Sequence, residues 1–367
     1  LHLSIRQLEV TFCPEIERMK FSGVAKILAV NIGLWLLLEL CAFAILFLTP
    51  PEPDQRAKSR DWVSQAQLSF SGGLYTWDDY CLWRLSPGYQ TPNEAPARFW
   101  GDGPLRINSQ GMRGPERSVQ KPEGVRRILV VGGSHPMGMY VNYAQTYGAV
   151  IEQELNRQGD VRWQVLNAAA PGHTSFQVRR YIEKYALKYA PDIVISDVGV
   201  NDTLPLSAEF PLPDHEVNTP PVWAVQARPI LEVSAVYRLM RRWLQPSATP
   251  SQANEPDGQS YGVRVSREKH ADNLDAMKEL ANSHDFNVLF LGQVSVDLHR
   301  SGRATCVYAD TEHEPHVDLC AFWQSYGADA GRYFADPIHA NPDGHAMIAA
   351  KVLSKLRSLD WIQQEEQ

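Results

Sequence analysis

The sequence predicts an α/β protein with a parallel sheet covered by helices on both faces, preceded by one transmembrane helix. From about residue 127 onward, short apolar segments alternate with longer segments of helical periodicity, which is typical of a parallel sheet with helical crossovers. The short segments are apolar throughout instead of alternating with polar residues, which indicates strands buried on both faces. An apolar run over residues 27–48 predicts the transmembrane helix.

The composition is that of a globular protein and excludes one class of partner. Of the 367 residues, 44% are hydrophobic and 21% are charged, and the formal net charge at pH 7 is −7. Nucleic-acid binding requires a basic surface to contact phosphates, and the sequence contains no basic block. We therefore expect no nucleic-acid partner. The chain is long enough for one large domain with additions or for two smaller domains.

The apolar run ILAVNIGLWLLLELCAFAILFL is interrupted only by Asn31 and Glu39. A buried helix of a soluble domain would normally show a polar face, whereas this run is apolar nearly all round. An acidic side chain near the centre of a span costs about 3 kcal/mol on insertion scales. We therefore expect Glu39 either to be protonated or to face a partner.

The segments that flank the span suggest its processing and orientation. Residues 1–26 form a predicted N-terminal tail, in which Met19 is a natural start and residues 1–18 are either an upstream extension or a poorly ordered segment. No small-residue cleavage site follows the span, so we expect an uncleaved anchor. Lys20 and Lys26 before the span favour an N-terminus on the inside. Arg56, Lys58 and Arg60 follow the span, so the preference is weak.

The five cysteines leave the redox compartment open. Cys306 and Cys320 bracket a short polar loop, and they would form a disulfide in an oxidising compartment or remain reduced otherwise. His313, His316 and Cys320 lie in one stretch, but their spacing matches no strong zinc pattern. We expect a solvated loop there, and the sequence predicts no metal and no cofactor.

The chain after the span divides into a linker with an N-terminal apron, residues 49–120, and a main domain, residues 121–360. The apron is rich in Trp, Pro and Gly and shows no long helical period, so we expect it to pack irregularly on the main domain. The main domain has expected strands at 127–132, 162–167, 192–199 and 286–292, and expected helices at about 143–158, 174–189, 267–284 and 343–358.

Residues 203–265 interrupt this alternation and are rich in proline. The insertion follows the C-terminal end of a strand, where open α/β sheets bind ligands, so we expect a lid or substrate-binding flap. It contains a predicted helix, Glu232–Leu244, and disorder is the alternative for residues 246–260. Arg241 and Arg242 on this helix could bind an anionic glycan or lipid headgroup, or could simply be solvated.

Ser134 follows two glycines at the end of the first predicted strand, in RILVVGGSHPMG. Serine is a favoured helix N-cap and glycine eases the turn, so this stretch alone favours a cap. A serine at the start of a helix can equally be a nucleophile, because the helix dipole stabilises negative charge nearby. The later strand ends distinguish the two interpretations.

Each later block carries a group that acyl transfer requires. Gly172 lies on a turn after the second strand, Asn201 follows the third, and Asp336 and His339 stand three apart near the C-terminus. A serine hydroxyl becomes a nucleophile when a histidine, held by a carboxylate, takes its proton. The N–H groups of Ser134 and Gly172, with the amide of Asn201, can stabilise the oxyanion.

These blocks resemble those of the SGNH/GDSL hydrolase superfamily: a Gly-Asp-Ser strand end, a Gly turn, Gly-x-Asn-Asp and Asp-x-x-His, in this chain order. INSQGMRGPE, residues 107–116, also resembles the leader of membrane-anchored bacterial members. The resemblance implies a flavodoxin-like three-layer α/β/α sandwich. It also implies roles for five residues, with Ser134 as nucleophile, His339 as base, Asp336 as the carboxylate that orients the base, and Gly172 and Asn201 as oxyanion donors.

Two residues depart from the family pattern. Gly133 stands where the family usually has Asp; because that Asp is not the triad carboxylate, no catalytic role is lost. His135, directly after the serine, is unusual and could line the substrate pocket. Pro136 lacks an N–H but fits the first turn of a helix.

We therefore expect a membrane-anchored serine esterase that removes acyl groups from an O-acylated envelope glycan or lipid on the extracytoplasmic side. An O-acyltransferase would use the same triad and pass the acyl group to a sugar hydroxyl instead of water. A non-catalytic glycan-binding or assembly protein is the third alternative, and the intact Ser, Asp and His set argues against it.

Overall fold

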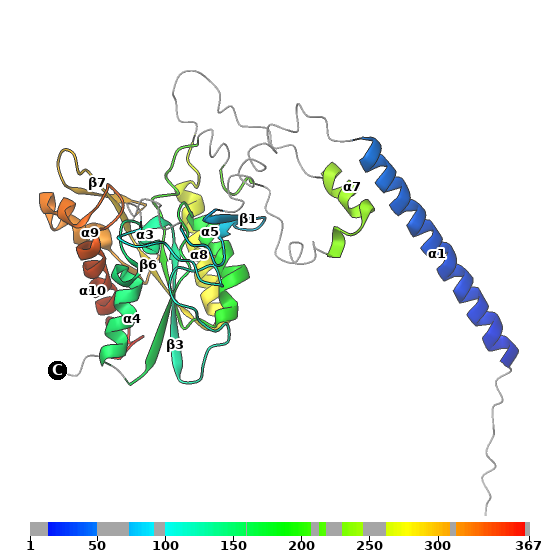
Figure 1. The fold of residues 1–367 in the computed structure, drawn as a ribbon, viewed down its shortest axis with the longest axis horizontal. Helices are drawn as coiled ribbons and strands as arrows, with labels where there is room; N and C mark the ends of the chain where they lie inside the picture. Colours follow the sequence, from blue (N-terminus) through cyan, green and yellow to red (C-terminus); the bar gives the residue numbers. More distant parts are fainter. Residues whose placement is uncertain are drawn as a thin grey trace, which may run out of the picture. The chain divides into compact units, whose positions relative to one another are not determined.

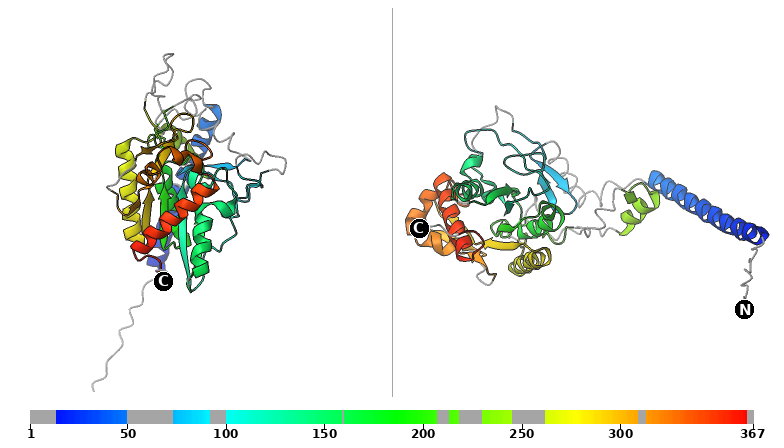
Figure 2. Two further views of the ribbon diagram at one scale, coloured as in Figure 1. Left: turned by 90° about the vertical axis from the view of Figure 1, so that its left-hand side faces the viewer. Right: turned by 90° about the horizontal axis from the view of Figure 1, so that it is seen from below.

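The computed structural model divides the chain into two units (Figures 1 and 2). One unit contains the N-terminal helix and residues 226–247, and the other contains the rest of the chain from residue 58 onward. The structure describes residues 14–49, 73–91, 100–158, 160–206, 213–217, 230–244, 262–308 and 313–363.

A five-stranded parallel sheet forms the centre of the larger unit, in the order β4-β3-β5-β6-β9. The strands are β3 (Val125–Gly132), β4 (Arg162–Asn167), β5 (Ile193–Asp197), β6 (Asn287–Leu291) and β9 (His316–Val317). The first of them along the chain lies between the second and the third, which is the flavodoxin-like order 2-1-3-4-5. The predicted fold class is confirmed. In such sheets ligands bind where the strand order reverses, here at the carboxyl ends of β3 and β5.

Helices cover both faces of this sheet (Figures 1 and 2). Helices α4 (Tyr147–Gln158) and α10 (Pro342–Ser358) pack on one face. Helices α5 (Ser175–Tyr181) and α8 (Arg267–His284) pack on the other. These four helices with the sheet between them form the three layers.

Strand β3 shows why its sequence is apolar throughout. Ile128 and Val130 join the hydrophobic cluster under α4 and α10, whereas Leu129 and Val131 join the cluster under α5 and α8. Successive side chains of a strand point to opposite faces, so a strand covered on both sides needs apolar residues at every position. The composition that predicted the parallel sheet therefore follows from this double burial.

The predicted helix over 174–189 is regular only in its first part. Helix α5 ends at Tyr181, and the chain continues as one π-helical segment, Ile182–Ala186, and a 3₁₀ turn, Leu187–Tyr189. Apolar spacing reports which face of a helix is buried but does not distinguish these hydrogen-bond patterns. Further short elements were not predicted: β1 (Tyr75–Asp78), β2 (Leu82–Leu85), α3 (Ser134–Met137), β7 (Gln293–Val296), β8 (Ala304–Val307), α9 (Leu319–Gln324) and the 3₁₀ segments Tyr143–Gln145 and Gly327–Tyr333.

The described parts of the apron, residues 73–91 and 100–120, pack on the main domain. Leu85, Leu105 and Ile107 form a hydrophobic cluster with Met137 and with the loop that follows β4. The apron thereby covers chain segments that follow the carboxyl ends of β3 and β4.

Arg113 ties the apron to the segment after Ser134. Its buried guanidinium donates to the carbonyl oxygens of Met137 (2.8 Å), Gly138 (2.6 Å) and Val141 (2.7 Å). Burial lowers the pKa of Arg113 to about 10, which still leaves the side chain charged at neutral pH. A charged donor shared among three carbonyls fixes the backbone of that loop.

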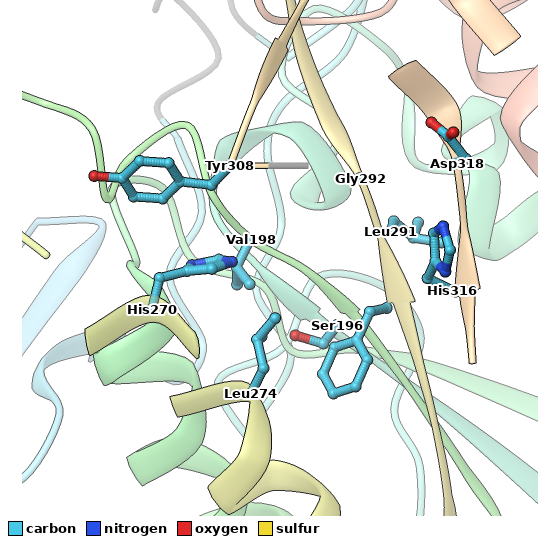
Figure 3. A pocket seen from close by; sticks show the side chains of 10 residues that line it. Ser196, Val198, His270, Leu274, Leu291, Gly292, Tyr308, His316 and Asp318 are labelled. Atoms are coloured by element: carbon cyan, nitrogen blue, oxygen red, sulfur yellow. The ribbon is translucent and has the colours of Figure 1, made fainter. Parts of the chain in front are cut away.

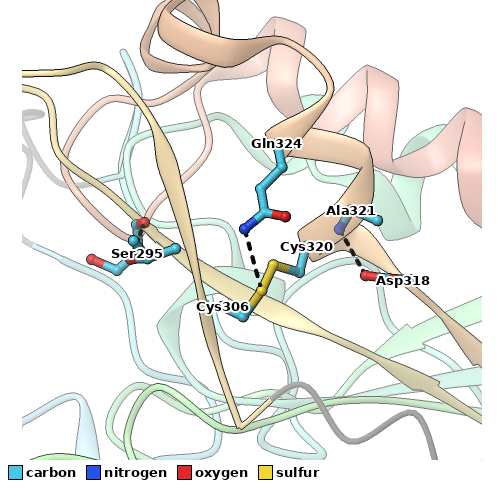
Figure 4. The surroundings of a disulfide bond; sticks show 7 residues. Ser295, Cys306, Asp318, Cys320, Ala321 and Gln324 are labelled. Carbon is cyan, nitrogen blue, oxygen red and sulfur yellow. Dashed lines mark hydrogen bonds between the residues drawn. A yellow bond between two sulfur atoms is a disulfide. The ribbon is translucent and has the colours of Figure 1, made fainter.

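Cys306 on β8 and Cys320 on α9 form a disulfide, with their Cα atoms 5.3 Å apart (Figure 4). The alternative of two reduced thiols is therefore excluded in this structure. The bond joins the hairpin β7–β8 to α9. The N-terminus of α9 is capped by Asp318, whose Oδ1 accepts from the N–H of Ala321 at 2.8 Å.

In the smaller unit, α1 (Pro14–Leu48) is a single continuous helix. Among the described residues, its part Ala25–Leu48 is the one helical stretch long and apolar enough to cross a membrane. The helix also includes the later part of the predicted tail, whereas residues 1–13 lie outside the described chain. The second helix of this unit is α7 (Ala235–Leu244), which begins three residues later than predicted. The predicted disorder of 246–260 concerns residues outside the described chain.

Candidate active site

Ser134 is the first residue of α3, directly after β3, and it is not the helix cap. The N-cap is Gly133, so no side chain caps this helix. Gly132 has φ +149°, and a Cβ added there would lie 2.1 Å from the carbonyl oxygen of Asp197. A Cβ on Gly133 would lie 2.3 Å from Nδ2 of Asn201. The backbone contact requires glycine at position 132, whereas a side chain at position 133 would displace the amide of Asn201.

The hydroxyl of Ser134 lies at the start of a chain of two hydrogen bonds. Its Oγ is 2.6 Å from Nε2 of His339, and Nδ1 of His339 is 2.7 Å from Oδ2 of Asp336. With Nδ1 donating to the carboxylate, Nε2 is left free to accept the hydroxyl proton. The structure thus brings together three residues that stand 202 to 205 positions apart, or three apart, in the sequence.

The carboxylate of Asp336 is held in its charged form. Burial opposes ionisation, but hydrogen bonds from the His339 side chain and from the N–H groups of Ile338 (2.9 Å) and His339 (2.8 Å) lower the pKa of Asp336 to about 2. The same three donors fix the orientation of the carboxylate. An ionised, oriented carboxylate stabilises the imidazolium that forms when histidine takes a proton.

Asn201 lies beside the peptide that precedes Ser134. Its Nδ2 donates one hydrogen bond to the carbonyl oxygen of His173 at 2.9 Å. An amide group has two N–H donors, so a second one remains for another acceptor. The neighbouring Asp202 is fully buried and accepts from the N–H of Ser175 at 2.8 Å and lies 2.7 Å from Nδ1 of His270. These bonds fix the loop that carries Asn201.

Gly172 lies on a turn with φ +79°, and two side chains donate hydrogen bonds to the carbonyl oxygens of this turn. Arg264 donates to its carbonyl oxygen at 2.7 Å, and Trp83 donates from Nε1 to the carbonyl oxygen of Pro171 at 3.1 Å. The Arg264 side chain is itself buried against Asp214, with an Nη2 to Oδ2 distance of 2.9 Å. Sequence analysis did not identify these supporting residues, because nothing local distinguishes an arginine or tryptophan that contacts a distant loop.

His135 points its Nδ1 toward a buried carboxylate, at 2.9 Å from Oδ2 of Asp197. Asp197 is fully buried and is also contacted by the hydroxyl of Tyr147 at 3.2 Å and by Nε2 of Gln293 at 2.5 Å. The imidazole lies in a small cavity whose other lining residues are mostly apolar: Val200, Gly292, Gln293, Val294, Leu319, Trp323, Phe334 and Ile338. A signal for Asp197 was available, since it is the one charged residue in the buried strand IVISD.

The other predicted binding residues belong to the smaller unit, and the triad does not line the second cavity of the main domain. Arg241 and Arg242 are on α7, in the smaller unit. The pocket in Figure 3 lies between the sheet and α8, and Ser134, Asp336 and His339 are not among its lining residues. These are Ser196, Val198, His270, Leu274, Phe290, Leu291, Gly292, Tyr308, His316 and Asp318.

The histidines near Cys320 have carboxylate partners. His313 lies 3.3 Å from Asp275, and His316 lies 2.9 Å from Glu314. Cys320 is in the disulfide. Across the described residues, no group of three or more His, Cys, Asp and Glu side chains is placed to hold a metal ion.

Replacement of Asn201 by alanine should lower kcat about 100- to 1,000-fold with little change in KM, because one oxyanion donor contributes mainly in the transition state. Steady-state kinetics with an aryl ester measure both constants. The exposed Asn282→Ala on α8 serves as the control and should behave as wild type. An effect confined to KM would make Asn201 a ground-state binding residue.

Comparison with known proteins identifies a family. A model of the GDSL-like lipase/acylhydrolase family matches residues 128–352, which is more than half of the chain. A search of curated proteins finds no match.

Several solved structures are similar to this chain. One is an acetyl xylan esterase, AlAXEase, with 15% identity, a TM-score of 0.38 and coverage of 62% of this chain and 98% of that one. TesA has 17% identity, a TM-score of 0.40 and coverage of 64% and 99%. Axe2, an acetylxylan esterase from Geobacillus stearothermophilus, has 12% identity, a TM-score of 0.38 and coverage of 65% and 97%. On the family match, the chain belongs to the GDSL-like lipase/acylhydrolase family and is an ester-hydrolysing enzyme.

Proposed function

We propose that the protein is a membrane-anchored serine esterase that removes a small acyl group from an O-acylated envelope glycan or lipid. One observation carries the proposal: the hydrogen-bonded series Asp336, His339 and Ser134, with Nε2 of His339 only 2.6 Å from the serine Oγ. A base at this distance can take the hydroxyl proton as the oxygen attacks.

The reaction proceeds in two balanced steps. In the first, His339 takes the proton of Ser134 while Oγ bonds to the ester carbonyl carbon. The C–O bond to the alcohol then breaks, and the alcohol leaves with the proton from His339. In the second, water loses a proton to His339 and attacks the acyl-Ser134, so that the carboxylic acid leaves and the proton returns to Oγ. The N–H groups of Ser134 and Gly172 and the amide of Asn201 stabilise the negative oxygen in both steps.

The cavity that contains His135 is suited to an acyl chain. It includes the residue after Ser134, the residue before Asn201 and the residue before His339, so it borders three of the proposed catalytic segments. Apolar residues such as Val294, Trp323 and Phe334 dominate its lining. An apolar lining favours a hydrocarbon group over a charged one.

Labelling with an active-site reagent tests the proposal directly. The full chain in detergent, incubated with a fluorophosphonate, should form a covalent adduct that maps to Ser134 by peptide mass analysis. It should also hydrolyse p-nitrophenyl acetate, and added alcohols should divert the acyl group only to a minor extent. An adduct elsewhere, or none together with no hydrolysis, would refute the esterase mechanism; predominant transfer to the alcohol would identify an acyltransferase.

The orientation of the anchor has its own expected result. The Cys306–Cys320 disulfide supports an oxidising compartment for the main domain. An alkaline phosphatase fused after Gln367 should therefore be active in cells, and the same reporter fused after Lys26, on the other side of the span, should be inactive. Activity of only the Lys26 fusion, at equal expression, would reverse the topology.

A further inference from the structure

The apolar helix α1 and the short helix α7 pack against each other within the smaller unit. Ala42, Ala235 and Leu239 are buried in this contact, and Leu46 and Val236 pack against them. Ala42 and Leu46 lie four apart on α1, as do Ala235 and Leu239 on α7, so one face of each helix forms the contact. Small alanines allow helices to approach closely in membranes.

Glu39, the acidic residue within the apolar run, binds the N-terminus of α7. Its carboxylate accepts hydrogen bonds from the hydroxyl of Ser234 and from the N–H of Ala235 at 2.6 Å, with the N–H of Val236 at 3.4 Å. The first N–H groups of a helix have no partner within the helix and carry a partial positive charge. An anion there satisfies both the helix end and the carboxylate.

The contact fixes the direction of α7. Glu39 meets the first turn of α7, while later residues of both helices, Leu46 and Leu239, lie further along the same contact. The two helices therefore run in the same direction, toward Leu48. Glu39 precedes Leu48 by nine positions, which corresponds to about 13 Å along a helix. The ten residues of α7 extend about 15 Å, enough to reach the end of the apolar segment.

Residues 230–244 also expose large apolar side chains, both before α7 and on it, alongside the exposed Arg238 of α7. Val233 (82% exposed), Ile230 (78%), Trp243 (66%) and Met240 (51%) present large apolar side chains without cover from the described chain. In water such a surface would be unfavourable, whereas α1 next to it has the length and composition of a membrane span.

We propose that residues 230–244 form a second membrane-embedded element, which enters one leaflet, docks on α1 through Glu39 and inserts its exposed apolar side chains among the lipid acyl chains, while Arg238 extends to the headgroups. The proposal rests on the proposed role of α1 as a membrane anchor. It removes two costs at once, because an unpaired carboxylate in hydrocarbon and the uncapped N–H groups of a helix in hydrocarbon are both unfavourable. The partner expected for Glu39 is then the N-terminus of α7 in the same chain.

This attachment has a consequence for the catalytic domain. The chain leaves that domain after Val225 and returns to it at Ala248. Arg264, which follows the return, donates to the carbonyl oxygen of Gly172. The embedded segment is thus followed in the chain by Arg264, which positions the proposed oxyanion donor Gly172.

Fluorescence quenching in lipid vesicles tests the proposal with the full chain. A bimane label on Met240→Cys, in a background with Cys13→Ala, Cys41→Ala and Cys81→Ala, should be quenched by doxyl-labelled phosphatidylcholine and be protected from aqueous iodide. The same label on Leu36→Cys reports on α1 and should also be quenched by the doxyl lipid. A label on His299→Cys, exposed in the main domain, should respond to iodide alone.

The outcomes separate the two proposals. If the label at position 36 is not quenched by the lipid, the anchor itself is wrong. If position 36 is quenched by lipid but position 240 responds to iodide, the anchor stands and the embedded α7 is refuted. Protection of position 240 from both quenchers would mean that protein covers it, which refutes lipid as the occupant.

The docking contact is tested by substitution at Glu39. Glu39→Ala should shift the equilibrium of α7 toward the undocked, iodide-accessible state by about tenfold or more, the effect of losing hydrogen bonds to a charged group. Glu39→Gln keeps an acceptor oxygen and should restore much of the protection. Asn31→Ala is the control, because Asn31 donates only to its own helix, to the carbonyl oxygen of Ile27 at 2.8 Å. Equal iodide accessibility in Glu39→Ala and wild type would refute the docking role.

Discussion

Ser134→Ala is expected to lower ester hydrolysis by about four to six orders of magnitude, because it removes the oxygen that we propose as the nucleophile. The loss should appear almost entirely in kcat. The fold should persist, since the substitution deletes one half-buried oxygen whose only hydrogen bond given by the structure is to His339. Initial rates with an aryl ester and the thermal unfolding midpoint of the same preparation measure the two effects.

The control for this substitution is a serine that is remote from the site. Ser283 is exposed on α8, and its hydroxyl donates only to the carbonyl oxygen of Glu279 in its own helix. Ser283→Ala should keep full activity and full fluorophosphonate labelling, whereas Ser134→Ala should lose both. Activity of Ser134→Ala within a few-fold of wild type, with an unchanged melting midpoint, would rule out the proposed nucleophile.

The sheet could be predicted from sequence because its physical cause is local. A strand covered on both faces needs an apolar residue at each position, so β3 and β5 are recognisable in isolation. The polar groups at strand ends could be recognised for a related reason. Residues such as Ser134 and Asn201 follow apolar strands directly, and the carboxyl ends of parallel strands meet at one edge of the sheet.

The supports of the site could not be predicted, because each is a contact between segments far apart in the chain. Arg113 contacts a loop 24 to 28 positions away, Trp83 contacts one 88 positions away, and Arg264 reaches back 92 positions. The residues next to them in the sequence do not indicate which distant segment they contact. Glu39 is an intermediate case, since its apolar surroundings indicated either a protonated side chain or a partner, and only the structure identifies the N-terminus of α7.

The departure at position 133 illustrates a limit of matching by motif. The family pattern gives Asp there, and sequence comparison alone records Gly133 as a difference. The structure supplies a steric reason, because a Cβ would lie 2.3 Å from Nδ2 of Asn201. Gly133→Ala should therefore displace the Asn201 amide and reduce kcat toward the value of Asn201→Ala. Gly103→Ala, where an added Cβ meets nothing within 4 Å, should have no effect.

His339→Ala should reduce kcat about as much as Ser134→Ala, because the serine proton then has no acceptor. Asp336→Asn should be less damaging, since the base remains present but is held without a charged partner. His299→Ala, an exposed histidine outside the site, is the control and should be fully active. Equal activity of His339→Ala and wild type would show that this histidine is not the base.

The pH dependence of the wild-type rate distinguishes a histidine base from a carboxylate. The pKa of Asp336 is lowered to about 2 by its hydrogen bonds with His339 and Ile338, which outweigh burial. A group with a lowered pKa remains charged as the pH falls from 8 to 5, so Asp336 contributes no change in rate over that range. Only neutral imidazole accepts a proton, so kcat should rise as the pH is raised from about 5 to 8. A rate that is constant between these limits, or that falls with increasing pH, would contradict the assignment of His339 as the base.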